Sequence, residues 1–99
     1  MARWYVRNGY RVIARNWTVR GGELDVVARR GSLVVVCEVK ARSTNSWGSP
    51  WEAVTPLKQQ RVRRTGLAFV RSLGEPGLAV RFDVAAVTGT SLEMMHDAF

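Results

Sequence analysis

Cysteine and long apolar runs are scarce in this sequence of 99 residues. A single cysteine, Cys37, excludes an intrachain disulfide and gives no support for an oxidising compartment. The longest uninterrupted apolar run covers only residues 33–37, whereas a membrane-spanning helix needs roughly 20 apolar residues. The first residues also lack the apolar stretch of a signal peptide. We therefore expect a cytoplasmic protein with no membrane partner.

The sequence contains a single histidine. It also contains no internal repeat. The one histidine, His96, stands far along the chain from Cys37, so the sequence offers no nearby base for a cysteine nucleophile. We expect Cys37 to be a small buried hydrophobe, because free cysteine is usually buried. With 46% apolar residues, no linker and no low-complexity tract, residues 1–99 predict one globular domain.

Acidic residues are outnumbered by basic ones. Fifteen lysines and arginines face eight acids, for a formal net charge of +7, and thirteen of the fifteen cations are arginine. A basic excess of this size favours a polyanionic partner, and arginine binds phosphate through two parallel hydrogen bonds. Nucleic acid is the expected partner, although a compositional bias toward arginine would give the same excess.

Apolar periodicity and turn residues predict the order of the elements. Thr55-Pro56 is a strong helix start, with a hydroxyl at the N-cap and proline at the first helical position. The expected elements are a short helix (2–8), strands (10–17, 23–29 and 33–41), a loop (43–50), a helix (56 to about 73), a strand (79–87) and a last short strand (91–95). This order, (α)βββαβ(β), predicts an α/β (α+β) fold with a small mixed sheet covered by helices.

Charged residues interrupt two of these apolar strands. Glu23 and Asp25 lie in the first, and Glu38 and Lys40 lie in the second. Residues two apart share one face of a strand. In a hairpin that turns near Gly31, Asp25 pairs with residues 36–38, which makes Asp25 and Glu38 neighbours.

Two neighbouring carboxylates repel each other unless a proton or a cation lies between them. Oxygen ligands of this kind hold Mg²⁺, and a bound metal activates water for phosphodiester hydrolysis. Lys40 would place a positive charge beside the reacting phosphate. The alternative is a solvated strand face, since alternating strands often expose charges to water.

Asp25 followed by Glu38-Val39-Lys40 resembles the PD-(D/E)xK, restriction-endonuclease-like signature. The segments GYRVIARNW, GGELDVVARRGSLVVVCEVKAR, WGSPWEAVTPLKQQRVRR, RFDVAAV and HDAF, in this order, resemble the small bacterial YraN-like proteins and cover nearly the whole chain. Leu24 stands where the superfamily often has proline. The YraN-like family is thought to be related to archaeal Holliday-junction resolvases, so the resemblance implies a restriction-endonuclease-like core.

The resemblance also implies roles for particular residues. Asp25 and Glu38 would be the ligands of Mg²⁺ or Mn²⁺, Glu23 a supplementary ligand, and Lys40 the catalytic lysine. The family usually has a longer first helix with a further acid, so we expect a shortened first helix and weaker metal binding here. The residues expected to contact nucleic acid lie on the second helix: Lys58, Gln60, Arg61, Arg63 and Arg64, with Gln59 as a further polar candidate.

Three functional hypotheses follow. The first is a Mg²⁺-dependent endonuclease that hydrolyses DNA and is either selective for branched or junction structures or only weakly selective. A homodimer would suit this hypothesis, because cleavage of a junction usually needs two active sites. The second is a nuclease-fold module that binds nucleic acid with little or no turnover. The third is an interaction domain with no nucleic-acid role. Outside the site, we expect Asp83 to pair with an arginine, His96 to be packed or on the surface, and Trp47 and Trp51 to pack their loop onto the body.

Overall fold

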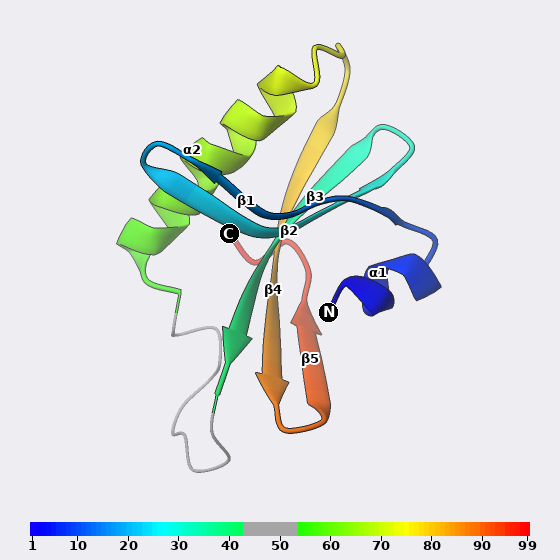
Figure 1. Ribbon diagram of the computed structural model, residues 1–99, viewed down its shortest axis with the longest axis vertical. Coiled ribbons are helices and arrows are strands. Elements are labelled where there is room, and N and C mark those ends of the chain that lie inside the picture. The colour runs from blue at the N-terminus through cyan, green and yellow to red at the C-terminus, as the bar shows by residue number, and fades with distance from the viewer. Residues whose placement is uncertain (43–53) are drawn as a thin grey trace.

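The computed structural model describes residues 1–42 and 54–99, and it has the predicted order of elements, αβββαββ (Figure 1). The predicted loop at 43–50, with Trp47 and Trp51, lies outside these residues. The elements are α1 (Ala2–Arg7), β1 (Arg11–Val19), β2 (Gly22–Arg30), β3 (Leu33–Ala41), α2 (Pro56–Ser72), β4 (Ala79–Thr88) and β5 (Ser91–Met95). Neither helix in the described ranges is long and apolar enough to cross a membrane.

The strands form one mixed sheet in the order β1-β2-β3-β4-β5. Strands β1 to β3 are antiparallel neighbours, β3 and β4 are parallel, and β5 pairs antiparallel with β4. A parallel pair requires a crossover connection, and α2 lies on the connection from β3 to β4. In this order the most apolar strand, β3, lies at the centre of the sheet.

Local sequence explains the bounds of α2. The Thr55 hydroxyl accepts a hydrogen bond from the Lys58 backbone N–H at 3.2 Å, and Pro56 occupies the first turn. The helix ends at Ser72 with Leu73 as its C-cap, and Gly74 follows with a φ of +67°, in the left-handed region that favours glycine. The predicted boundaries of this helix are confirmed to within one residue.

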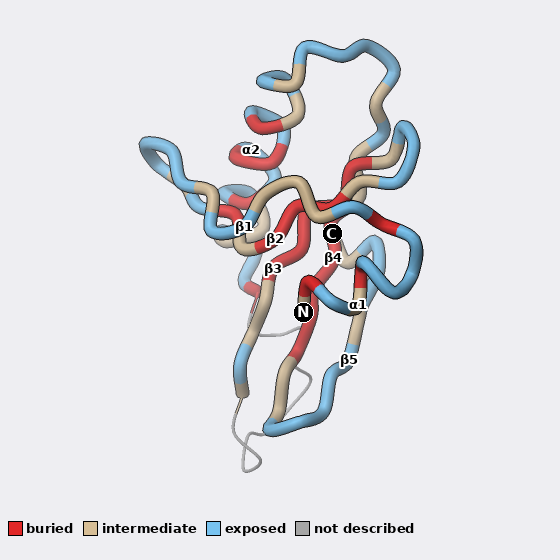
Figure 2. Tube along the Cα trace, turned by 45° about the vertical axis from the view of Figure 1, so that its right-hand side comes forward, coloured by how far each residue is buried: buried red, intermediate tan, exposed pale blue. Residues whose placement is uncertain are grey.

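Each face of the sheet packs against its own helix. On one face, Tyr5 of α1 joins Val35 and Cys37 in a buried cluster, which confirms the expected burial of Cys37. On the other face, Val62 and Phe69 of α2 pack in a second cluster, which includes alternate residues of β3. The two clusters thus cover β3 on both sides, and Figure 2 shows in red the residues that are buried.

The buried carboxylate of Asp83 links the face of the sheet that α1 covers to the C-terminal end of the chain. Arg81 binds it through two hydrogen bonds of 2.9 Å, and the Tyr5 hydroxyl donates a third at 2.8 Å. His96 Nδ1 lies 2.9 Å from the same carboxylate, and its ring lies 5.1 Å from that of Trp4. The expected pairing of Asp83 with an arginine is confirmed, and His96 is packed against an aromatic ring.

Candidate functional site

The hairpin of β2 and β3 brings the two acids of the signature together. Its pairing includes Val26 opposite Cys37, so the next positions outward are Asp25 and Glu38. Here the Asp25 Oδ2 atom accepts a hydrogen bond of 2.8 Å from the Val39 backbone N–H. A side-chain carboxylate thus satisfies a backbone donor of the neighbouring strand. The expectation that Asp25 and Glu38 are neighbours is confirmed, because both line one pocket.

Glu38 is the buried acid of this pair, at 5% exposure. Its Oε1 atom lies 2.8 Å from Lys58 Nζ and 3.6 Å from Lys40 Nζ. Lys58 comes from α2, whereas Lys40 lies two residues along β3 on the same face. A buried carboxylate is costly to desolvate unless it is paired, and the two ammonium groups supply that pairing.

The two lysines differ in how readily they hold a proton. Partial burial, together with the nearby ammonium of Lys58, lowers the pKa of Lys40. The hydrogen bond to Glu38 raises the pKa of Lys58. Two cations beside one carboxylate compete for it, and the closer one is stabilised. Of the two lysines, Lys40 therefore has the lower pKa.

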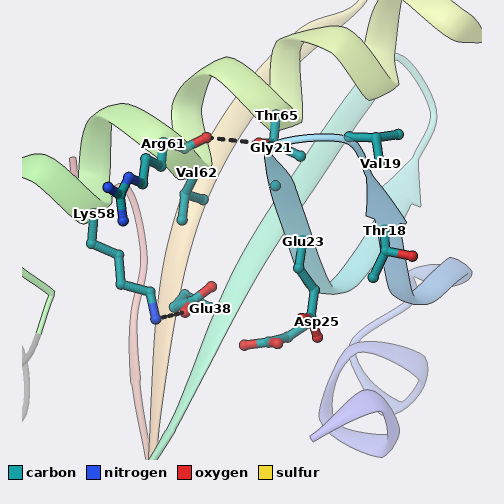
Figure 3. A pocket seen from close by; sticks show the side chains of 11 residues that line it. Thr18, Val19, Gly21, Glu23, Asp25, Glu38, Lys58, Arg61, Val62 and Thr65 are labelled. Carbon is teal, nitrogen blue, oxygen red and sulfur yellow. Dashed lines mark hydrogen bonds and ion pairs between the residues drawn. The ribbon is translucent and has the colours of Figure 1, made fainter.

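The acids open into a pocket of about 520 Å³ between the β1–β2 hairpin and α2 (Figure 3). Figure 3 shows Lys58 and Arg61 descending from the helix on one side, with Thr18 and Val19 on the other. Glu23, Asp25 and Glu38 lie between these two sides. The lining residues are Thr18, Val19, Gly21, Gly22, Glu23, Asp25, Glu38, Lys58, Arg61, Val62 and Thr65.

The basic residues predicted on α2 divide between two surfaces. Lys58 and Arg61 line the acidic pocket. Gln60, Arg63 and Arg64 line a separate depression on the helix, together with Leu67, Ala68 and Arg71. The structure therefore brings together two of the five expected nucleic-acid contacts with the acids.

Two residues of the predicted site region have structural contacts of their own. The Arg63 guanidinium lies 5.7 Å from the centre of the Phe82 ring and 5.9 Å from that of Phe99. The Gln59 side chain donates a hydrogen bond of 3.0 Å to the Val54 carbonyl. Both side chains are therefore engaged with neighbouring parts of the chain, outside the acidic pocket.

Sequence reasoning missed the wall of the pocket that β1 supplies. Val19 is 41% exposed, and Thr18 beside it is exposed as well. The sequence signal was the pair Gly21-Gly22, which ends this strand with a tight turn. Where that turn would lie relative to α2 depends on tertiary packing and is not readable from local sequence.

The carboxylates at this pocket are enough for a Mg²⁺ ion that is held by two protein ligands. In residues 1–42 and 54–99, no group of three or more histidine, cysteine, aspartate or glutamate side chains is arranged to hold a metal ion. Mg²⁺, however, is commonly bound through one or two carboxylates, with water and substrate phosphate completing the shell. Asp25 and Glu38 supply two carboxylates at one pocket, so the residues present fit such an ion.

Comparison with known proteins identifies the family of this chain. The model of a family described as "Uncharacterised protein family UPF0102" matches residues 1–87. A UPF0102 protein of Leifsonia xyli is 43% identical over 86 residues, which cover 87% of this chain and 73% of that protein. One of Desulfosudis oleivorans is 36% identical over 99 residues, covering 98% and 80%. One of Myxococcus xanthus is 48% identical over 81 residues, covering 82% and 64%. The chain therefore belongs to the UPF0102 family, the YraN-like proteins.

Proposed function

We propose that this protein is a Mg²⁺-dependent endonuclease that hydrolyses phosphodiester bonds of DNA, with the site organisation of the PD-(D/E)xK superfamily. The observation that carries the proposal is the meeting of Asp25 and Glu38, from adjacent strands, in one pocket with Lys40 and Lys58 beside Glu38. A net charge of +7 suits a polyanionic substrate.

Each residue has a distinct part in the proposed reaction. Asp25 and Glu38 would hold the ion, with Glu23 at the mouth of the pocket as a supplementary acid. Bound Mg²⁺ would supply polarisation of a phosphoryl oxygen and a more acidic water. Lys58 and Arg61 neutralise the phosphates of the strand. Lys40 orients the attacking water through its Nζ atom and, because its pKa is lowered, passes a proton more readily than an ordinary lysine.

Metal binding is the first test of the proposal. Mn²⁺ and Mg²⁺ are titrated calorimetrically into the wild type and into Asp25→Asn, with Glu93→Gln, an exposed acid on β5, as the matched control. We expect saturable heat in the wild type and in the control, and its loss in Asp25→Asn. Equal binding by Asp25→Asn would remove this residue from the metal site.

Cleavage is the second test. Labelled DNA substrates, linear and branched, are incubated with the wild type, Asp25→Asn and Lys40→Ala in Mg²⁺. We expect both variants to lose cleavage while they keep the wild-type fold and most of their DNA affinity, since neither residue is needed for the basic wall of the pocket. A variant that cuts at the wild-type rate would contradict the assigned role.

A second candidate function is binding of nucleic acid without turnover. It is favoured by the ion pair of 2.8 Å between Glu38 and Lys58 and by the engagement of Asp25 with the Val39 N–H, since both acids already have protein partners. This candidate predicts salt-sensitive DNA binding that needs no divalent ion and yields no metal-dependent product. Lys58→Met frees Glu38 from its closest cation, so metal binding that appears only in this variant would favour the binding module.

A further inference from the structure

The pocket has two walls of opposite chemistry. On the side of α2, Lys58 and Arg61 present cations. On the opposite side, Val19 presents an apolar side chain that is 41% exposed, at the end of β1 (Figure 3). The acids lie between the two walls. A ligand that fills this space meets positive charge along one edge and an apolar surface along the other.

The apolar wall is held in place by direct contact with the helix. Val19 pairs with Gly22 across the β1–β2 turn. A Cβ atom added to Gly22 would lie 2.0 Å from the Thr65 Oγ1 atom, so the turn backbone rests on α2 with no room for a side chain. Thr65 is itself fixed, because its hydroxyl donates to the Arg61 carbonyl at 2.8 Å. The distance between the walls is therefore set by packed atoms and not by a free hairpin.

A nucleotide has the matching chemistry. Its phosphate is anionic, while the flat faces of its base are largely apolar, so that they stack on aromatic side chains and lose unfavourable contact with water against aliphatic ones. In a duplex those faces are covered by neighbouring bases, so only base edges, sugars and phosphates reach a protein surface. An exposed valine opposite a pair of cations therefore gains contact mainly with a base that is unstacked and unpaired.

We propose that the pocket takes an unpaired nucleotide, with its phosphates against Lys58 and Arg61 and its base against Val19. Val19 is a positioning residue in this arrangement, because it contacts the base and not the reacting phosphate. The inference rests on the proposed function and deepens it, since it names a single-stranded segment as the preferred substrate at the acids.

The test compares two matched exposed valines. Fluorescence anisotropy at low salt in Ca²⁺, which neutralises the acids, measures binding of a labelled oligothymidylate, a blunt duplex with the same number of phosphates, and an oligonucleotide of the same length without bases. The proteins are the wild type, Val19→Ser and Val6→Ser, the last on α1 at 58% exposure. Circular dichroism checks that all three are folded.

We expect the wild type to prefer the single strand, and Val19→Ser to lose roughly fivefold of that affinity through loss of apolar contact. Val19→Ser should bind the duplex and the base-free strand as the wild type does, and Val6→Ser should match the wild type throughout. Removing the bases and replacing Val19 should then cost no more together than removing the bases alone. If Val19→Ser loses affinity equally for all three ligands, or for none of them, the proposed contact between the base and Val19 is wrong, while the proposed function stays intact. A wild type that binds none of the ligands would overturn both.

Discussion

Replacing the buried acid Asp83 with asparagine gives the sharpest test of what holds the sheet to α1 and to the end of the chain. Asp83 is fully buried and receives hydrogen bonds from Tyr5, from two atoms of Arg81 and from the Asp97 backbone N–H. Asparagine has nearly the same shape but carries no charge, and its amide N–H₂ faces donors. Removing one partner of a buried ion pair costs about 3–5 kcal/mol. Because 22% of the Arg81 side chain reaches solvent, we expect the low end, about 3 kcal/mol.

The assay is urea unfolding followed by tryptophan fluorescence at pH 7. Glu75→Gln is the control, since Glu75 forms an ion pair with Arg29 while 49% of its side chain is exposed, and such pairs contribute about 1 kcal/mol or less. Equal slopes of the unfolding curves would indicate that only the free energy of unfolding has changed. If Asp83→Asn lowers that free energy no more than Glu75→Gln does, the buried contacts of Asp83 do not stabilise the fold as described.

Lowering the pH should remove the stabilisation that the charged Asp83 side chain provides. Burial acts to raise the pKa of Asp83, but the hydrogen bonds from Arg81, His96 and Tyr5 outweigh it, and the net pKa is lowered. A carboxyl group whose pKa is lower in the folded state stabilises the fold above its unfolded pKa of about 3.9. That contribution is lost as pH falls toward the folded value. The wild type and Asp83→Asn should therefore converge in stability below pH 4, and a constant difference between them would contradict this account.

Three further predictions concern other contacts. Gly22→Ala should cost about 1–3 kcal/mol in urea unfolding through its clash with Thr65, and much less in a Thr65→Ala background; additive costs would contradict the contact. Cys37, whose pKa burial raises to about 12, should react with a thiol reagent only on unfolding, and a fast native reaction would refute its burial. Since the chain has only Lys40 and Lys58, ¹³C NMR of methylated lysines resolves both, and Lys58→Met should raise the pKa of Lys40 toward its usual value of 10.5; no change would show that Lys58 has no influence on it.

Local signals in the sequence predicted most of the fold. The cap at Thr55-Pro56 located α2, and the turn at Gly31 with its alternating flanks located the hairpin that carries Asp25 and Glu38. Strand β1 begins later than predicted, at Arg11, and it also ends later, at Val19, because its pairing with β2 continues to Gly22. Pairing of this kind depends on the partner strand and leaves little local trace.

The two acids at the centre of the site were easier to predict from the sequence than the residues that surround them. Lys58 contacts Glu38 only because α2 crosses the sheet at that point, and no local pattern encodes the crossing. The spacing of Lys58, Arg61 and Arg64 suggested one basic face, but a step of three residues drifts by about 60° around a helix. After two steps the drift is about 120°, which explains why Arg64 lines a different surface from Lys58.

The parallel pairing of β3 and β4 also bears on the order in which the chain assembles. The hairpin of β2 and β3 closes through neighbours such as Arg30 and Leu33, whereas Leu33 meets its β4 partner Ala79 only after the whole crossover has been ordered. Contacts that close long loops form late, because the entropy of the loop must be lost before the contact gives any return. Asp25 and Glu38 would then approach each other early in folding, before Lys58 arrives with the helix. During that interval Lys40, which lies on β3 itself, already stands beside Glu38, and the closer partner Lys58 is added when the helix packs on the sheet.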